Sequence, residues 1–165
     1  MSAETTVGRS RPGFGLPGRI QSPNSRPRSI AMVGLGEGGA AVARRMKEEG
    51  VGPLDVRVFA SPRVPAADAL ATIKSNGDDL HRALQEADMI FVVACRGDDV
   101  GLAPVVARIA RDRGVQVTAI YLVPSTQAAA GVEDENLKML RAGVHMLVVA
   151  TDETYVAAMI AALGG

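Results

Sequence analysis

A glycine-rich turn at residues 34–39 has the residue types and spacing that bind phosphate. Gly34, Gly36 and Gly39 match the pattern G-x-G-x-x-G, and Gly38 adds a fourth glycine. The turn follows an apolar run and precedes an alanine-rich segment with helical spacing. Backbone N–H groups with no neighbouring Cβ can approach a phosphate closely there, at the positive end of a helix dipole. The same glycines would also permit tight packing of a helix on a strand, so the pattern leaves both roles open.

Three carboxylates bear on whether this turn could bind phosphate. Glu37 lies inside the glycine turn, where it would repel phosphate unless it faces solvent or reaches a metal ion. Asp98 and Asp99 follow a later apolar run. They could form a Mg²⁺ or acid–base pair. They could equally belong to a solvated loop, because neighbouring side chains in a turn usually diverge.

A dinucleotide site is an alternative use of the same turn. Such a site usually has an acidic residue about 20 positions later, on the ribose hydroxyls. Here Ser61 and Arg63 stand after the second predicted strand, and they could instead meet the 2′-phosphate of NADP. That would describe a small NADP-binding reductase. His81 and His145 are both expected to be structural, so the residues that reduction would need are not found.

Composition excludes several classes of function. The chain of 165 residues has a formal net charge of zero, which gives no bulk attraction to nucleic acid or to a membrane surface. No apolar run reaches the length of a membrane span. Cys95 is the only cysteine, so no disulfide can form within the chain, and this fits a reducing cytoplasm.

Residues 1–28 have a different composition from the rest. They carry five arginines against a single acidic residue, Glu4, together with proline, glycine and serine. Such a segment cannot bury enough apolar surface to order itself, so we expect a disordered tail. A weak docking arm for an acidic partner is the alternative. The tail lacks the apolar stretch of a signal peptide. Residues 29–165 form the predicted domain.

The domain alternates apolar runs with helical patterns. The predicted strands are Ile30–Val33, Val56–Ala60, Met89–Ala94, Val117–Val123 and His145–Ala150. The predicted helices are Gly38–Glu49, Ala66–Ile73, Asp78–Glu86, Ala103–Arg113, Asp134–Ala142 and Glu153–Leu163. The strands are continuously apolar, as in a parallel sheet buried on both faces. Right-handed crossovers then give a three-layer, doubly wound, Rossmann-like α/β domain. We expect a five-stranded parallel sheet ordered 2-1-3-4-5.

Helix ends are marked by particular residues. Gly50, Gly114 and Gly143 stand where a glycine commonly follows the last turn. Thr151 or Asp152 is placed to cap the last helix.

Several segments together resemble the GTPase domain of the FtsZ/tubulin superfamily. "GLGEGGAAVARRM" is similar to the family's first glycine turn, through residue 46. Residues 87–89 (Ala-Asp-Met) and 103–106 (Ala-Pro-Val-Val) are similar to segments on either side of its phosphate loop. "HMLVVATDETY" is similar to its sixth strand and following loop. The resemblance extends from about residue 30 to 162.

The resemblance implies a set of nucleotide contacts. Carried over by position, they are Gly34, Gly36, Gly38, Gly39, Arg96, Gly97, Gly101 and Asp152. The ligand would be GTP or GDP.

The departures from the family imply loss of function. The interval Arg96–Leu102 is two residues shorter than the family's G-G-G-T-G-T-G loop and carries Asp98 and Asp99. Like charges near 4 Å cost about 4 kcal/mol at an effective dielectric of 20. The family's asparagine after the first turn is Ala41 here, and the asparagine before Asp152 is Thr151. The family's long central helix, catalytic loop and C-terminal domain have no counterpart in this sequence.

The sequence therefore predicts a degenerate FtsZ-like module. We expect it to be non-catalytic or to bind nucleotide weakly, and to act by contact with a protein partner or by self-association. No catalytic residue and no metal ligand is assigned. An active hydrolase that uses Asp98, Asp99 or Asp152 around a metal, and the NADP-binding reductase, stay as alternatives.

Overall fold

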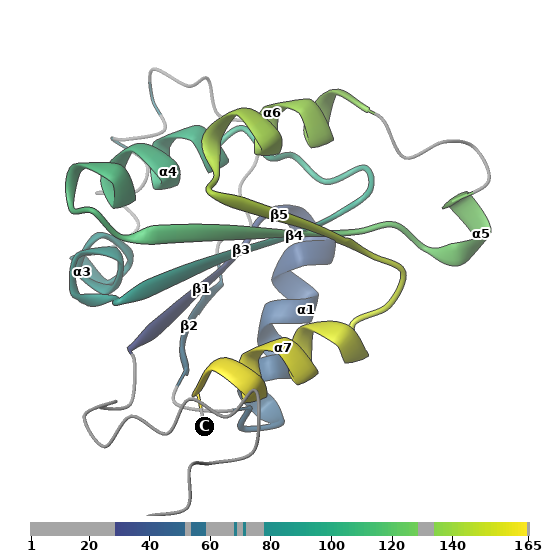
Figure 1. Ribbon diagram of the computed structural model, residues 1–165, viewed down its shortest axis with the longest axis horizontal. Coiled ribbons are helices and arrows are strands. Elements are labelled where there is room, and N and C mark those ends of the chain that lie inside the picture. The colour runs from purple at the N-terminus through teal and green to yellow at the C-terminus, as the bar shows by residue number, and fades with distance from the viewer. Residues whose placement is uncertain are drawn as a thin grey trace, which may run out of the picture.

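A computed structural model of the chain describes residues 29–51, 54–58, 68, 71, 78–128 and 134–164 (Figure 1). The described strands are β1 (Ile30–Gly34), β2 (Leu54–Val58), β3 (Met89–Cys95), β4 (Gln116–Leu122) and β5 (Met146–Ala150). The described helices are α1 (Gly36–Glu48), α3 (Asp78–Glu86), α4 (Ala103–Asp112), α5 (Ser125–Ala128), α6 (Glu135–Gly143) and α7 (Thr154–Gly164).

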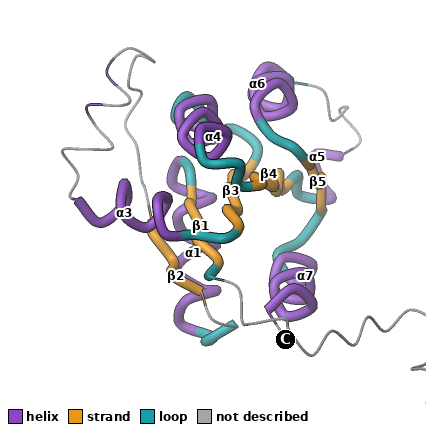
Figure 2. Tube along the Cα trace, turned by 60° about the vertical axis from the view of Figure 1, so that its left-hand side comes forward, coloured by secondary structure: helices purple, strands orange, loops and turns teal. Residues whose placement is uncertain are grey.

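The strands form one open sheet in the order β2-β1-β3-β4-β5, and neighbouring strands run parallel. Val33 of β1 lies opposite Arg57 on one side and Val92 on the other. Figures 1 and 2 show α1 and α7 on one face of the sheet and α3, α4 and α6 on the other. The predicted class, a parallel α/β domain of Rossmann-like architecture, is confirmed.

Each face of the sheet has its own apolar core. Successive side chains of a strand point to opposite faces. Ala31 and Val33 therefore pack with α3, α4 and α6, while Ile30 and Met32 pack with α1 and α7. All five residues of β1 are buried, as are six of the seven in β3. The continuous apolar runs in the sequence correspond, in these strands, to burial on both faces.

β5 differs from the prediction of a buried strand. Every residue of β5 is at least partly exposed, although the sequence Met-Leu-Val-Val-Ala is wholly apolar. The physical reason is its position, because β5 is the last strand of the sheet and pairs with β4 alone.

Element boundaries shift by one or two residues from those predicted. β2 begins at Leu54 rather than Val56, and α1 begins at Gly36 rather than Gly38. The short helix α5 was not expected from the sequence, where Ser125–Ala128 directly follows Pro124.

Two of the three predicted helix-ending glycines are confirmed. Gly50 and Gly114 follow the last turns of α1 and α4 with φ angles of 65° and 67°, the left-handed region that glycine favours. Gly143 was assigned wrongly, because it is the last residue of α6 and Val144 leaves the helix in extended conformation. At the other end of α6, Asp134 caps the helix by accepting the Leu137 N–H at 2.8 Å.

Some predictions fall outside the described residues. These are the tail 1–28, most of the predicted helix 66–73, and the pair Ser61 and Arg63. Among the described residues, no helix is both long enough and apolar enough to cross a membrane.

Candidate functional site

The glycine turn brings α1 unusually close to the sheet. A Cβ on Gly34 would collide with the backbone of Gly39, and a Cβ on Gly39 would collide with the carbonyl of Val93 in β3. Leu35 N–H also donates to Val93 O at 2.8 Å, which fixes the turn against β3. Gly34 and Gly39 therefore have the packing role that the sequence left open.

The first turn of α1 lacks a cap from its own segment. Leu35 occupies the N-cap position, and no side-chain cap hydrogen bond forms there. Gly36 adopts a φ of 65°, which a residue with a side chain rarely adopts. The N–H groups that open a helix have no partner within the helix and need one from elsewhere.

Asp98 supplies that partner from another loop. Its Oδ1 accepts the Gly38 N–H at 3.0 Å, and its Oδ2 accepts the Gly39 N–H at 2.8 Å. Oδ2 also accepts the Cys95 N–H at 2.6 Å. We call the three N–H groups of Gly38, Gly39 and Cys95 the cradle. A negatively charged group is favoured there by the helix dipole, so the cradle is an anion site occupied by a carboxylate of the chain itself.

The side chain of Asp98 also lies against the two central glycines. A Cβ on Gly36 would come within 2.6 Å of the Asp98 carboxyl carbon, and a Cβ on Gly38 within 2.9 Å of its Oδ2. These glycines keep open the space that the carboxylate fills. Glu37, between them, is exposed, in agreement with the solvent-facing option for its carboxylate.

The loop that carries Asp98 is held at several points. Asp98 N–H donates to Cys95 O at 3.0 Å, and Gly97 turns with a φ of 91°. Asn136, at the start of α6, donates its amide N–H to Asp98 O at 2.6 Å. Arg96 N–H donates to Leu122 O at 2.8 Å, at the end of β4. These bonds fix the loop in the position that directs the carboxylate into the cradle.

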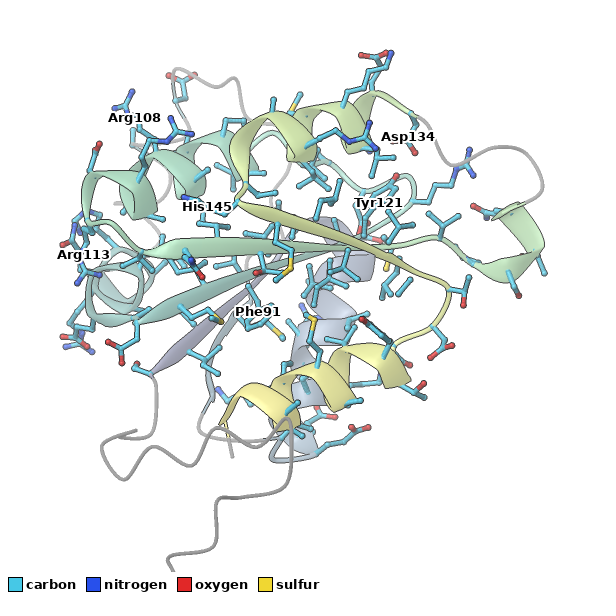
Figure 3. All side chains as sticks on the ribbon, viewed as in Figure 1. Phe91, Arg108, Arg113, Tyr121, Asp134 and His145 are labelled. Carbon is cyan, nitrogen blue, oxygen red and sulfur yellow. The ribbon has the colours of Figure 1, made fainter. Side chains whose placement is uncertain are left out.

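The side chain of Arg96 contacts α5 and the residue that caps α6. Its guanidinium donates to Gln127 O at 3.0 Å, and its Nε lies 3.8 Å from Asp134 Oδ2. Tyr121 donates its hydroxyl to the same carboxylate oxygen at 2.6 Å (Figure 3). Burial, and then the hydrogen bond to Asp134, raise the pKa of Tyr121. Arg96 therefore supports the loop through its contacts with Gln127 and Asp134.

Asp99 and the remaining loop glycine form a separate local turn. Asp99 Oδ1 accepts the Gly101 N–H at 2.8 Å, two residues ahead. Asp98 and Asp99 thus diverge and do not form a carboxylate pair. Within the described part of the chain, no group of three or more His, Cys, Asp or Glu side chains is placed to hold a metal ion.

Asp152 is occupied at the start of α7. Its Oδ1 accepts the Thr154 N–H at 2.9 Å and also the Thr154 hydroxyl. These bonds, the hydroxyl first, lower the pKa of Asp152. Asp152 was predicted both as a cap and as a nucleotide contact, and its bonds to Thr154 are those of a cap. Nearby, Arg45 of α1 donates to Glu153 at 2.7 Å, which ties α1 to α7.

Sequence reasoning missed the residues that position Asp98. Cys95 contributes its backbone N–H to the cradle, while Asn136 and the Tyr121–Asp134 pair hold the loop from elements far along the chain. The signal that could have found them is Asp134 itself, an aspartate at the start of a predicted helix, where such residues commonly act as caps. Its second oxygen, and the amide of Asn136, acquire partners only once β4, α6 and the loop are packed together.

Comparison with known proteins supports the fold assignment. No family model matches the chain. An empty FtsZ dimer from M. jannaschii matches with a TM-score of 0.55 at 22% identity, covering 75% of this chain and 45% of that one. A point mutant of M. jannaschii FtsZ matches with a TM-score of 0.54 at 22% identity, covering 74% of this chain and 46% of that one. This chain therefore spans less than half of the FtsZ chains that it resembles, and over that span it has an FtsZ-like fold.

Proposed function

We propose that this chain is a non-catalytic FtsZ-like module that acts by protein contact, with a partner protein or with its own copy. In this proposal GTP and GDP bind weakly or not at all, and GTP is not hydrolysed. The observation that carries the proposal is the Asp98 carboxylate in the cradle, bonded to the N–H groups of Gly38, Gly39 and Cys95.

Electrostatics supports a closed cradle. A nucleotide phosphate would have to displace the Asp98 carboxylate and give up three charge-assisted hydrogen bonds, each worth about 1.5–3 kcal/mol. The displaced carboxylate would remain close to the phosphate, and two like charges near 4 Å repel by about 4 kcal/mol at an effective dielectric of 20. The loop contacts of Asn136 and Arg96 would resist that displacement.

The arrangement of the other acidic residues gives no support to a metal-assisted hydrolase. Asp98 accepts hydrogen bonds from the start of α1, Asp99 from its own loop, and Asp152 from the start of α7, so the three carboxylates have different partners. Transition-state stabilisation needs preorganised donors directed at the developing charge. The cradle donors are such groups, and here they are committed to Asp98.

The test is nucleotide binding by the parent and by Asp98→Ala. Titration calorimetry with GDP and GTP, each with Mg²⁺, should give weak or undetectable binding for the parent. Asp98→Ala removes the competing charge and frees the cradle, so we expect affinity for GDP to rise by roughly several hundredfold. Phosphate release from GTP should stay at the buffer rate for both proteins.

Two variants serve as controls for charge alone. Asp99→Ala removes the neighbouring carboxylate, and Glu37→Gln neutralises an exposed carboxylate in the first turn of α1. Neither residue bonds to the cradle, so neither change should open it. The proposal would be overturned if the parent bound GTP tightly and Asp98→Ala weakened that binding. Mg²⁺-dependent GTP turnover by the parent would also overturn it.

A further inference from the structure

β5 has the sequence of a buried strand in the position of an exposed one. Met146–Ala150 contains no charged residue, no proline and no glycine. Met146 is 50% exposed and Val149 42%, and Tyr155 in the first turn of α7 is 51% exposed. Parallel sheets are normally covered on both faces. Exposed apolar side chains gathered at this end of the sheet indicate a surface that a binding partner covers.

The outer edge of β5 has no neighbouring strand among the described residues. Figure 2 shows β5 at one end of the sheet, with α6 and α7 on its two sides. Val123 N–H donates to Ala150 O, and the register pairs Met146 with Thr118 of β4. Because backbone groups alternate direction along a strand, Met146, Val148 and Ala150 face β4, and the N–H groups of Leu147 and Val149 point outward. Edges are usually protected by lysine, proline or a bulge, and β5 has neither lysine nor proline.

We propose that β5 pairs in antiparallel fashion with β5 of a second copy, across a two-fold axis at Val148. A two-fold interface places the same surface on both partners, so it must be self-complementary. Centring on Val148 sets Met146 opposite Ala150 and Leu147 opposite Val149, a larger side chain against a smaller one in each pair. Beyond the strand, His145 lies opposite Thr151.

The charge pattern favours a second copy over a charged partner. No like charges oppose each other in this register, and an uncharged edge gives an acidic or basic peptide no electrostatic advantage. The inference specifies the self-association that the proposed function allows, but it does not depend on Asp98. Oligomeric state and nucleotide binding are separate measurements, so either proposal can fail alone.

Sedimentation velocity of the full chain over a wide concentration series tests the pairing. We expect a reversible monomer–dimer equilibrium. Val149→Lys places a charge in the apolar interface and should weaken the dimer by at least about tenfold. Met139→Lys on α6 is the matched control, because Met139 is 41% exposed and lies outside β5; it should leave the dimer unchanged.

A charge exchange on the axis tests the register. Val148→Lys and Val148→Glu should each reduce association, because each places two like charges directly opposite. An equimolar mixture of the two should recover a dimer, because opposite charges then meet. A parent that stays monomeric at every concentration would overturn the proposal. A dimer that Val149→Lys leaves intact would also overturn it. If the Val148 variants do not fold, the comparison of the parent with Val149→Lys tests the proposal by itself.

Discussion

The carboxylate of Asp98 occupies the N–H groups that the glycine turn presents. The glycine turn could be recognised from the sequence, and Gly36 shows the positive φ that such a turn requires. The occupant of the cradle could not be recognised, because it depends on the length of a loop some 60 residues away in sequence and on the bond from Asn136 to that loop. Sequence reasoning placed the Asp98 charge near the expected phosphate position, whereas the structure bonds it to the N–H groups of the cradle.

Cys95 gives a prediction at the scale of one residue. Burial, and next the Asp98 carboxylate, raise the pKa of the Cys95 thiol to about 11. The thiolate is the reactive form, so alkylation by iodoacetamide should be slow at pH 8 and should rise about tenfold per pH unit until the pH nears that pKa. Asp98→Ala should lower the pKa and speed the reaction at pH 8. A parent rate that levels off near pH 8.5, as for an unstructured cysteine peptide measured in parallel, would contradict this.

The same shift fixes the sign of a stability effect. A thiol whose pKa is higher in the folded chain than its ordinary value of 9.0 retains its proton better when folded. Its contribution to stability is therefore complete below pH 9 and is lost as the pH rises toward 11.

At the scale of elements, the contact of α1 with β3 shows what the sequence could and could not predict. A strand–turn–helix was predicted there and is present, because apolar periodicity and glycine spacing are local signals. The exposure of β5 was not predictable, because an apolar run reads the same at the centre and at the end of a parallel sheet. Gly143 was misread for a similar reason, since a helix can end one residue later without changing its pattern.

Two glycines in helices provide a matched test of that contact. Gly39→Ala would press a methyl group against the Val93 carbonyl, so we expect a loss of about 1–3 kcal/mol in the free energy of unfolding. Gly143→Ala would place its methyl 3.5 Å from the Ala107 Cβ, an ordinary contact, and should be neutral or stabilising by about 0.5–1 kcal/mol. Urea denaturation measures both. Equal stability of the two variants would show that α1 can move away from β3 at little cost.

At the scale of the whole molecule, Asp98 joins segments that are far apart in sequence. Its carboxylate bonds to the start of α1 and the end of β3, and its carbonyl bonds to α6. These contacts connect elements on the two faces of the sheet (Figures 1 and 2). The class of fold could be predicted from repeated local patterns in the sequence. The contacts of Asp98 could not, because they join residues that come close together only in the folded chain.

The last prediction uses that connection to separate stability from ligand binding. Asp98→Ala leaves the three cradle N–H groups without their partner, and each buried donor left unsatisfied typically costs about 1–3 kcal/mol. At roughly 2–4 °C per kcal/mol for a chain of this size, the midpoint of thermal unfolding should fall by about 5 °C or more. Inorganic phosphate should then raise the midpoint of the variant, because an anion that binds only the folded state stabilises it by mass action.

The parent provides the decisive comparison in the same experiment. Its cradle is already filled, so phosphate should leave its midpoint unchanged relative to chloride at equal ionic strength, and Asp99→Ala should behave like the parent. Scanning calorimetry of the three proteins in both salts measures this directly. A phosphate-dependent rise of equal size in the parent and in Asp98→Ala would show that phosphate binds elsewhere, and the Asp98 carboxylate would then not be what closes the cradle.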